Sequence, residues 1–122
     1  MSEYQIQAAF VELIQKRYPN ILFSATVGGI RLSIGAALKM KKAGYVRGVP
    51  DLVFFEPRRG YMGLCIEVKK KGGRPSKQQK QWKDDLRERG YRSVICTGLK
   101  ECLEEFQQYF SLDLPLLEAG KE

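Results

Sequence analysis

The sequence predicts an α/β fold in which a mixed β-sheet is flanked by helices. Apolar residues recur at helical spacing in some segments, short apolar runs typical of strands lie between them, and glycine or proline residues separate the two kinds. The 122 residues, of which 43% are hydrophobic, suffice for one domain with a modest core. We expect the order helix, strand, helix, strand, strand, helix, strand, helix (α-β-α-β-β-α-β-α).

The first three elements occupy the N-terminal third of the chain. Ser2 and Gln5 have the spacing of a capping box, and an apolar stripe then predicts a helix to about Arg17. Residues 21–26 predict a strand that ends at a pair of glycines. Residues 32–43 predict a short, lysine-bearing helix.

A β-hairpin is predicted next. Residues 51–56 form a nearly continuous apolar run, which is typical of a strand covered on both faces. Residues 57–60 contain proline and glycine and predict a turn. Residues 61–69 predict the returning strand.

The last three elements are a helix, a strand and a helix. The first helix follows a glycine-rich loop and is capped by Ser76, and we expect its Trp82 and Leu86 to contact the core rather than to stack on a base. Residues 91–97 predict a strand and residues 99–110 an amphipathic helix. The single domain is therefore predicted over 1–110, with 111–122 as a C-terminal tail.

Nothing in the sequence predicts a membrane or secreted protein. No apolar run approaches the roughly 18 residues that a membrane span needs, and the N-terminus lacks the basic and apolar regions of a signal peptide. We expect a cytoplasmic protein, with a viral or phage protein in a host cytoplasm left open.

The residue types that are scarce exclude several kinds of chemistry. Histidine is absent, which excludes histidine-based zinc sites and Ser-His or Cys-His nucleophile pairs. The three cysteines form no CxxC pair and are expected to be small buried hydrophobes. Catalysis would therefore depend on carboxylates, lysine, hydroxyls and a bound ion.

The net charge of +7 is unevenly distributed along the chain. Residues 13–50 contain seven basic residues and no acidic one, and a second basic cluster covers residues 69–80. One such run is often only a solvated face, but two clusters around one pair of carboxylates favour nucleic acid as the partner. The candidates for phosphate contacts are Lys39, Lys41, Lys42, Arg47, Arg74 and Lys77.

Two acidic residues on the predicted hairpin indicate a metal site. Asp51 begins one strand, and Glu67 follows sixteen positions later on the next, two residues before Lys69. A buried carboxylate is costly unless it is paired, protonated or bound to a metal. If the strands pair, the two carboxylates and the carbonyl of Val68 could hold Mg²⁺. Alternatively, Asp51 caps a turn, and Glu67 and Lys69 are surface charges of an edge strand.

This arrangement resembles the PD-(D/E)XK nuclease superfamily, with its restriction-endonuclease-like core, and more closely the VRR-NUC (virus-type replication-repair nuclease) family. The resemblance covers about residues 2–98. The matching segments are Ser2-Glu3-Tyr4-Gln5-Ile6-Gln7, Gly28-Gly29, Lys42-Ala43-Gly44, Gly48-Val49-Pro50-Asp51-Leu52, Ile66-Glu67-Val68-Lys69 and Gly73-Arg74-Pro75-Ser76-Lys77-Gln78-Gln79.

The resemblance implies a role for five side chains. Asp51 and Glu67 are implied to be metal ligands and Lys69 the catalytic lysine, with Mg²⁺ as the cofactor and Mn²⁺ as a substitute. Glu3 matches an N-terminal acidic position that reaches into the site, and Gln79 matches a glutamine that begins the next helix. Glu3 is also favoured by the dipole of its own helix, and Gln79 has capping-box spacing, so both have a structural alternative.

One further carboxylate departs from the family pattern. Glu56 stands at the turn end of the strand that Asp51 begins. We expect it to be solvated rather than to bind the metal.

The resemblance also implies a substrate and an assembly. Small single-domain members resemble Holliday-junction resolvases, which cut four-way DNA junctions as homodimers. No membrane partner and no small-molecule cofactor are expected. A nicking or restriction-like endonuclease, a flap-directed endonuclease and a non-catalytic DNA-binding protein remain alternatives. The candidates for the dimer contact are Ile6, Phe10, Leu112, Leu114 and Leu116, and the alternative is that the same residues complete the core.

Overall fold

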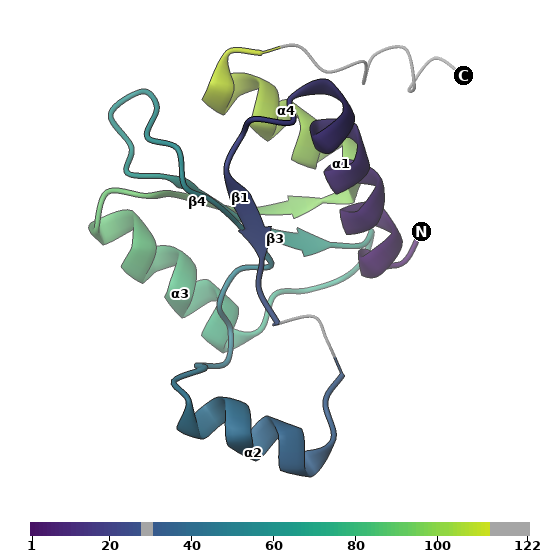
Figure 1. The fold of residues 1–122 in the computed structure, drawn as a ribbon, viewed down its shortest axis with the longest axis vertical. Coiled ribbons are helices and arrows are strands. Elements are labelled where there is room, and N and C mark those ends of the chain that lie inside the picture. The colour runs from purple at the N-terminus through teal and green to yellow at the C-terminus, as the bar shows by residue number, and fades with distance from the viewer. Residues whose placement is uncertain (28–30, 113–122) are drawn as a thin grey trace.

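A computed structural model describes residues 1–27 and 31–112 of the chain and confirms the predicted order of elements (Figure 1). None of the helices in these two ranges is both long and apolar enough to cross a membrane. The elements are α1 (Glu3–Arg17), β1 (Phe23–Ala25), α2 (Ile34–Lys42), β2 (Leu52–Phe54), β3 (Leu64–Lys69), α3 (Lys77–Glu88), β4 (Arg92–Thr97) and α4 (Gly98–Phe110).

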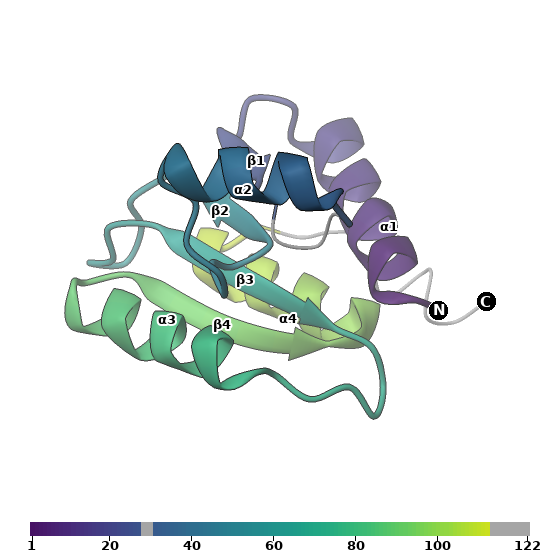
Figure 2. The same cartoon turned by 90° about the horizontal axis from the view of Figure 1, so that it is seen from below.

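The four strands form one mixed sheet in the order β1-β2-β3-β4 (Figure 2). β1 pairs antiparallel with β2, and β2 pairs antiparallel with β3, which confirms the predicted hairpin. β4 runs parallel to β3 after the crossover through α3. The carboxyl ends of β3 and β4 therefore lie at the same edge of the sheet, where β2 begins.

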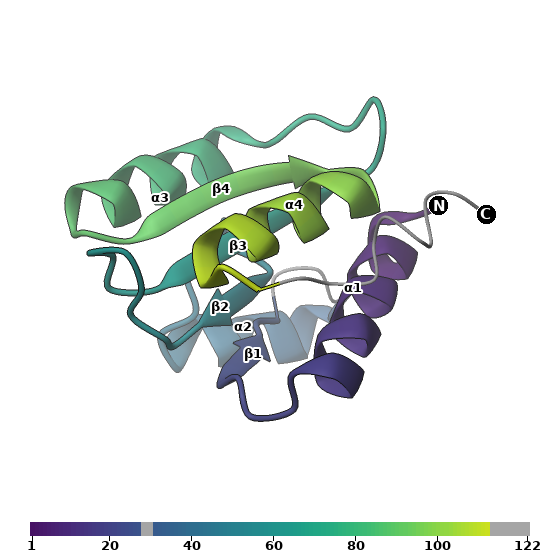
Figure 3. The ribbon, with the colours of Figure 1, turned by 90° about the horizontal axis from the view of Figure 1, so that it is seen from above.

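The helices form a layer on each face of the sheet. α1 and α4 pack together on one face, and α3 lies on the other face beside β4 (Figures 2 and 3). The core lies between the sheet and the α1–α4 layer. Its centre is aromatic: the rings of Phe10, Phe54 and Phe106 lie 6.1 to 6.3 Å apart in edge-to-face geometry.

The capping box predicted at the N-terminus fixes how α1 begins. The Ser2 hydroxyl accepts a hydrogen bond from the Gln5 amide, and the Gln5 side chain accepts one from the Ser2 amide. The apolar stripe of α1 then faces the core at Ile6, Phe10 and Ile14.

The expectation that Ile6 and Phe10 could form a dimer contact is wrong. Both side chains are buried in the core, because α1 turns its apolar stripe toward α4 and the sheet. Leu112 also packs against this core. Leu114 and Leu116 lie outside the described residues.

The expectation that Trp82 and Leu86 contact the core is also wrong. Both are only half-buried, neither belongs to the core cluster, and α3 contributes no buried residue. α3 instead reaches the sheet with a polar side chain: Nε of Arg87 donates a 2.8 Å hydrogen bond to the Ser93 carbonyl. The three cysteines, in contrast, are free and buried as expected.

Two adjacent phenylalanines offer a matched test of the core. Phe54 is completely buried, whereas Phe55 is 56% exposed. We expect Phe54→Ala to lower the free energy of unfolding by about 3–5 kcal/mol, because it leaves a cavity among the aromatic rings. Phe55→Ala should change it by less than about 0.5 kcal/mol. Urea denaturation measures both, and similar losses in the two variants would contradict the placement of the core.

Candidate active site

The pairing of β2 with β3 brings Asp51 beside Glu67. Leu52 is the register partner of Ile66, so Asp51 and Glu67 are the next pair along the antiparallel ladder. The backbone amide of Val68 donates a 2.8 Å hydrogen bond to Oδ2 of Asp51. The residues Asp51 and Glu67 are 8% and 4% exposed, so the predicted pair of buried carboxylates exists.

Strand alternation separates the site from the core. Ile66 and Val68 belong to the core cluster on the α1–α4 face. Glu67 and Lys69 therefore point to the opposite face, where α3 lies. At the end of β3, the face of the sheet toward α3 thus carries charged residues, and the face toward α1 and α4 carries the apolar core.

Lys69 lies between two carboxylates from different elements. Its Nζ is 3.6 Å from Oε2 of Glu67 and 3.8 Å from Oε1 of Glu3. The ammonium group is buried, and Glu3 is half-exposed in the first turn of α1. The structure therefore brings Glu3 to the site through Lys69.

Gln79 combines the two roles that the sequence left as alternatives. Its Oε1 accepts a 2.8 Å hydrogen bond from the Ser76 amide, which completes a capping box. Its Nε2 donates a 2.9 Å hydrogen bond to Oε2 of Glu67. An amide has both a donor and an acceptor, so one side chain starts α3 and holds the carboxylate.

The environment of Glu67 favours its protonated form. Burial raises the pKa of Glu67, and the nearby Asp51 carboxylate raises it further, while Lys69 lowers it, for a pKa of about 8. The neighbouring carboxylates of Asp51 and Glu67 repel each other when both are ionised. A cation between them would remove that cost.

The hydrogen bonds of Glu67 leave one oxygen without a partner. Oε2 interacts with Gln79 and Lys69, but Oε1 is buried and has no hydrogen-bond partner among the described residues. An orphaned buried oxygen beside a second carboxylate fits a hard divalent cation, which prefers oxygen ligands. No three His, Cys, Asp or Glu side chains within residues 1–27 and 31–112 form a metal-binding group. The fit to a divalent cation therefore depends on the two carboxylates of Asp51 and Glu67.

A small polar cleft of about 230 Å³ opens beside Asp51 and Lys69. Arg47 and Arg74 line it, as does the N-terminal turn of α3 through Ser76 and Gln79. The amides at the start of a helix favour anions, and both guanidinium groups add positive charge. The cleft is therefore suited to bind an anion next to the carboxylate pair.

The remaining predicted cationic residues do not line the cleft. Lys77 is exposed at the start of α3. The three lysines of α2 are also exposed, and this helix has no buried residue and stands apart from the sheet (Figure 1). These three lysines are Lys39, Lys41 and Lys42.

The comparisons with known proteins show which family the chain belongs to. The sequence model of the VRR-NUC domain family matches residues 1–100. The chain belongs to the VRR-NUC family. A solved structure of a VRR-NUC domain protein is similar over 92% of this chain and 90% of its own, with a TM-score of 0.77 and 26% sequence identity. No curated protein matches the sequence.

Membership of the VRR-NUC family makes the chain a member of a nuclease family with a PD-(D/E)XK-like core. The predicted fold class is thereby confirmed, since the structure has the mixed four-stranded sheet and four helices. The carboxylate pair at the carboxyl end of β3 is the candidate active site of this VRR-NUC domain.

Glu56 takes no part in the site. Its carboxylate accepts hydrogen bonds from the Leu22 amide, at 3.1 Å, and from Arg58, at 3.2 Å. The expectation that it does not join the carboxylate pair agrees with these contacts. It is, however, less solvated than expected, because its side chain is only 22% exposed. Through these hydrogen bonds, Glu56 connects Leu22, which precedes β1, to Arg58 of the hairpin turn.

Thr26 and Gly48 also position the VRR-NUC site. Gly48 belongs to one of the segments that match the family, whereas no pattern in the sequence indicated a role for Thr26. Thr26 donates from its hydroxyl to the Pro50 carbonyl, at 2.7 Å, and from its amide to the Asp51 carbonyl, at 2.8 Å. These bonds fix the backbone that carries Asp51. Gly48 has a φ of +100°, and a Cβ there would lie 2.7 Å from the backbone of Gln78.

Gly48 and Gly44 form a matched pair that separates strain from contact. Both have positive φ, but a Cβ on Gly44 would meet nothing within 4 Å. We expect Gly44→Ala to cost about 1–3 kcal/mol of stability through backbone strain alone. Gly48→Ala should cost more and also reduce cleavage, because it pushes α3, and with it Gln79, away from Glu67. Urea denaturation and a cleavage assay test this, and equal effects of the two substitutions would refute it.

Proposed function

We propose that the protein is an Mg²⁺-dependent DNA endonuclease that cuts four-way junctions as a homodimer. The observation that carries the nuclease chemistry is the buried pair of Asp51 and Glu67 beside Lys69, with Oε1 of Glu67 free of any hydrogen bond among the described residues. The VRR-NUC family membership supports phosphodiester hydrolysis in general.

The proposed ion site consists of the two carboxylates and the backbone carbonyl of Val68. Glu3 would act on it through water or through Lys69, since its carboxylate lies 3.8 Å from the ammonium group. A bound Mg²⁺ would polarise the phosphate and lower the pKa of a water molecule, and Mn²⁺ would substitute because it also prefers oxygen ligands.

Lys69 and Gln79 are proposed to act around this ion site. A buried ammonium group can orient the attacking water or stabilise the negative charge that develops on the phosphate oxygens. Gln79 holds Oε2 of Glu67 through its 2.9 Å hydrogen bond, which would leave Oε1 available to the ion. Gln79 is thus a positioning residue.

The cationic side chains support DNA as the substrate. Arg47 and Arg74 line the cleft next to the carboxylates, and Lys77 lies at the exposed start of α3. The lysines of α2 would extend this surface: Lys39, Lys41 and Lys42. Guanidinium and ammonium groups bind phosphates without reading sequence, so the proposed recognition is of shape and backbone.

The junction preference and the homodimer belong together. A four-way junction is resolved by two matched cuts, and a two-fold pair of identical chains supplies two equivalent sites. Light scattering should then give twice the 14.0 kDa chain mass. A monomer would refute paired cutting by this chain.

Cleavage of a defined set of substrates tests the proposal. A labelled four-way junction, a flap, a nicked duplex and a linear duplex are incubated with Mg²⁺, with Mn²⁺ and with EDTA. We expect cleavage with either metal, none with EDTA, and the junction cut fastest. Equal cutting of linear duplex would favour a restriction-like enzyme, and preferred cutting of the flap a flap endonuclease. Binding without any cutting would indicate a non-catalytic DNA-binding protein.

A further inference from the structure

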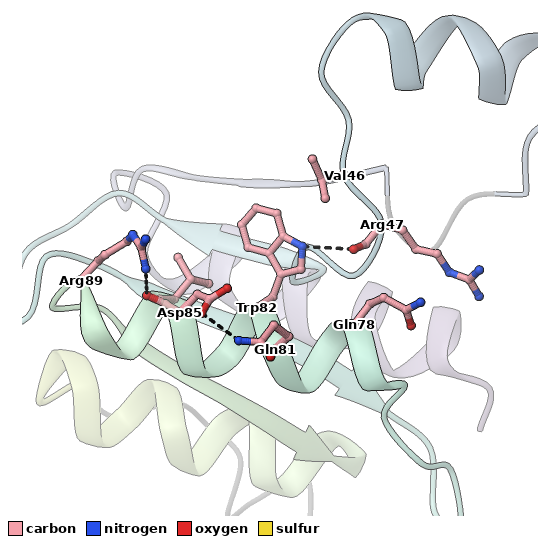
Figure 4. Close-up of a pocket in the computed structure, with 8 residues that line it drawn as sticks. Val46, Arg47, Gln78, Gln81, Trp82, Asp85 and Arg89 are labelled. Atoms are coloured by element: carbon pink, nitrogen blue, oxygen red, sulfur yellow. Dashed lines mark hydrogen bonds between the residues drawn. The ribbon is translucent and has the colours of Figure 1, made fainter.

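Figure 4 shows an open apolar groove of about 450 Å³, which shares Arg47 with the cleft of the candidate active site. One wall is the outer face of α3, with Trp82 and Leu86, and the other is the segment before β2, with Val46 and Arg47. Val46 is 58% exposed and Trp82 half-buried, so the groove presents apolar surface that the core does not use.

A hydrogen bond from its Nε1 fixes the indole ring of Trp82. Its Nε1 donates a 3.1 Å hydrogen bond to the backbone carbonyl of Arg47, which is drawn as a dashed line in Figure 4. This bond fixes the ring between α3 and the segment at Val46, and the ring lines the groove. A fixed aromatic ring at the surface is a suitable platform for a flat ligand.

The polar groups of the groove restrict the ligand further. Gln78, Gln81 and Arg89 line it together with the apolar residues. Gln81 donates a 2.9 Å hydrogen bond to the Asp85 carboxylate. Arg89 donates one of 2.9 Å to the Asp85 backbone carbonyl. The Asp85 carboxylate disfavours a phosphate on this wall. Amides beside an aromatic ring instead suit an uncharged heteroaromatic group with donors and acceptors on its edge.

The groove continues into the cleft of the candidate active site. Arg47 lines both, and its side chain makes no hydrogen bond or ion pair within the described part of the chain. Gln78 precedes Gln79, which holds Glu67. Gly48 packs against the backbone of Gln78, so the groove and the carboxylate pair share one wall. A nucleotide with its phosphate at Arg47 could therefore place its base over Trp82.

We propose that this groove binds an unpaired DNA base, stacked on Trp82, from a nucleotide next to the phosphate that is cut. This rests on the proposed nuclease function and explains how a branched substrate is distinguished. A continuous duplex keeps its bases stacked and paired, whereas the stack is interrupted at a branch point, so a base there is extruded at a lower cost. The base fills the groove, and Arg47 neutralises its phosphate.

The single tryptophan of the chain makes the contact directly observable. The fluorescence of Trp82 is titrated with a short single-stranded oligodeoxynucleotide in EDTA, so that no cutting takes place. An oligonucleotide of the same length and charge with abasic sites is the matched control. We expect the base-bearing strand to quench the fluorescence and the abasic strand to leave it nearly unchanged. Equal quenching by both would overturn the proposal.

Substitutions provide a second measurement. Binding of a labelled single strand by Trp82→Ala should be about 5- to 150-fold weaker, the range expected for loss of one stacked base, and binding of the abasic strand should not change. Trp82→Phe keeps a ring and should retain most of the affinity. Phe55→Ala removes an exposed aromatic ring outside the groove and should have no effect. Loss of abasic binding in Trp82→Ala would indicate general misfolding and overturn the assignment.

The outcomes separate this proposal from the nuclease proposal. Quenching without cleavage of any substrate would support the base site and refute the enzyme. Metal-dependent cleavage that Trp82→Ala leaves unchanged, together with no quenching, would refute the base site and support the enzyme. A fluorescence change that depends on protein concentration, without DNA, would show that a second copy of the chain covers the groove and would overturn the proposal.

Discussion

Lys69→Met is expected to reduce DNA cleavage by about 10²- to 10⁴-fold while leaving DNA affinity within a few-fold of the original. Its buried ammonium group lies within 4 Å of both Glu67 and Glu3, and no other lysine or arginine pairs with either carboxylate among the described residues. The loss should therefore appear in the rate at saturating DNA. Single-turnover cleavage of a labelled junction and fluorescence anisotropy measure the two quantities.

The adjacent lysine provides the control. Lys70 has the same side chain but is exposed, and among the described residues it forms no ion pair with Glu67 or Glu3. Lys70→Met should retain nearly full cleavage and lose at most a little affinity. If both substitutions reduced cleavage equally, the effect would be one of net charge, and the role of Lys69 at the carboxylate pair would be refuted.

Glu67→Gln is expected to remove most of the pH dependence of stability in metal-free protein. Burial, followed by the carboxylate of Asp51, raises the pKa of Glu67 from its ordinary 4.5 to about 8. The folded state therefore holds this proton more tightly than the unfolded state. The resulting stability is fully present below pH 4.5 and is lost as the pH rises through about 8. A shift of this size, at about 1.4 kcal/mol per pH unit, corresponds to a loss on the order of 5 kcal/mol.

Urea denaturation in EDTA across this pH range measures the effect. The original protein should become less stable as the pH rises, and Glu67→Gln, which cannot ionise, should be the more stable of the two at pH 9. Above pH 7, Mg²⁺ should restore the stability of the original protein, because it binds the ionised carboxylates of Asp51 and Glu67. It should leave the stability of Glu67→Gln unchanged. Parallel stability curves for the two proteins would contradict the raised pKa.

Local pattern was enough to predict the order of the elements. The Ser2–Gln5 and Ser76–Gln79 spacings predicted where two helices begin, and both capping boxes are present. The strands are shorter than predicted, because an apolar run extends past the residues that find a partner. Residues 61–69 predicted one strand, for instance, but only Leu64–Lys69 is a strand, since Tyr61 closes the hairpin turn with Arg58.

The candidate site was predictable where strand register alone decides it. Asp51 and Glu67 were expected side by side because a hairpin leaves few alternatives. The surface of α3 was not predictable, because a tryptophan at helical spacing has the same pattern whether it enters a core or lines a groove. Thr26 was missed for a related reason: its bonds to residues 50–51 join segments that are far apart in sequence.

The side-chain amide of Gln79 makes the position of the Glu67 carboxylate depend on the formation of α3. The group that starts α3 is the same group that holds Glu67, and it reaches that carboxylate only after the helix has formed and docked on the sheet. A chain that is still folding, or whose α3 has come loose, therefore lacks the hydrogen bond that holds Glu67. Under the proposed nuclease function, this dependence would restrict cleavage to molecules whose α3 is formed and docked on the sheet.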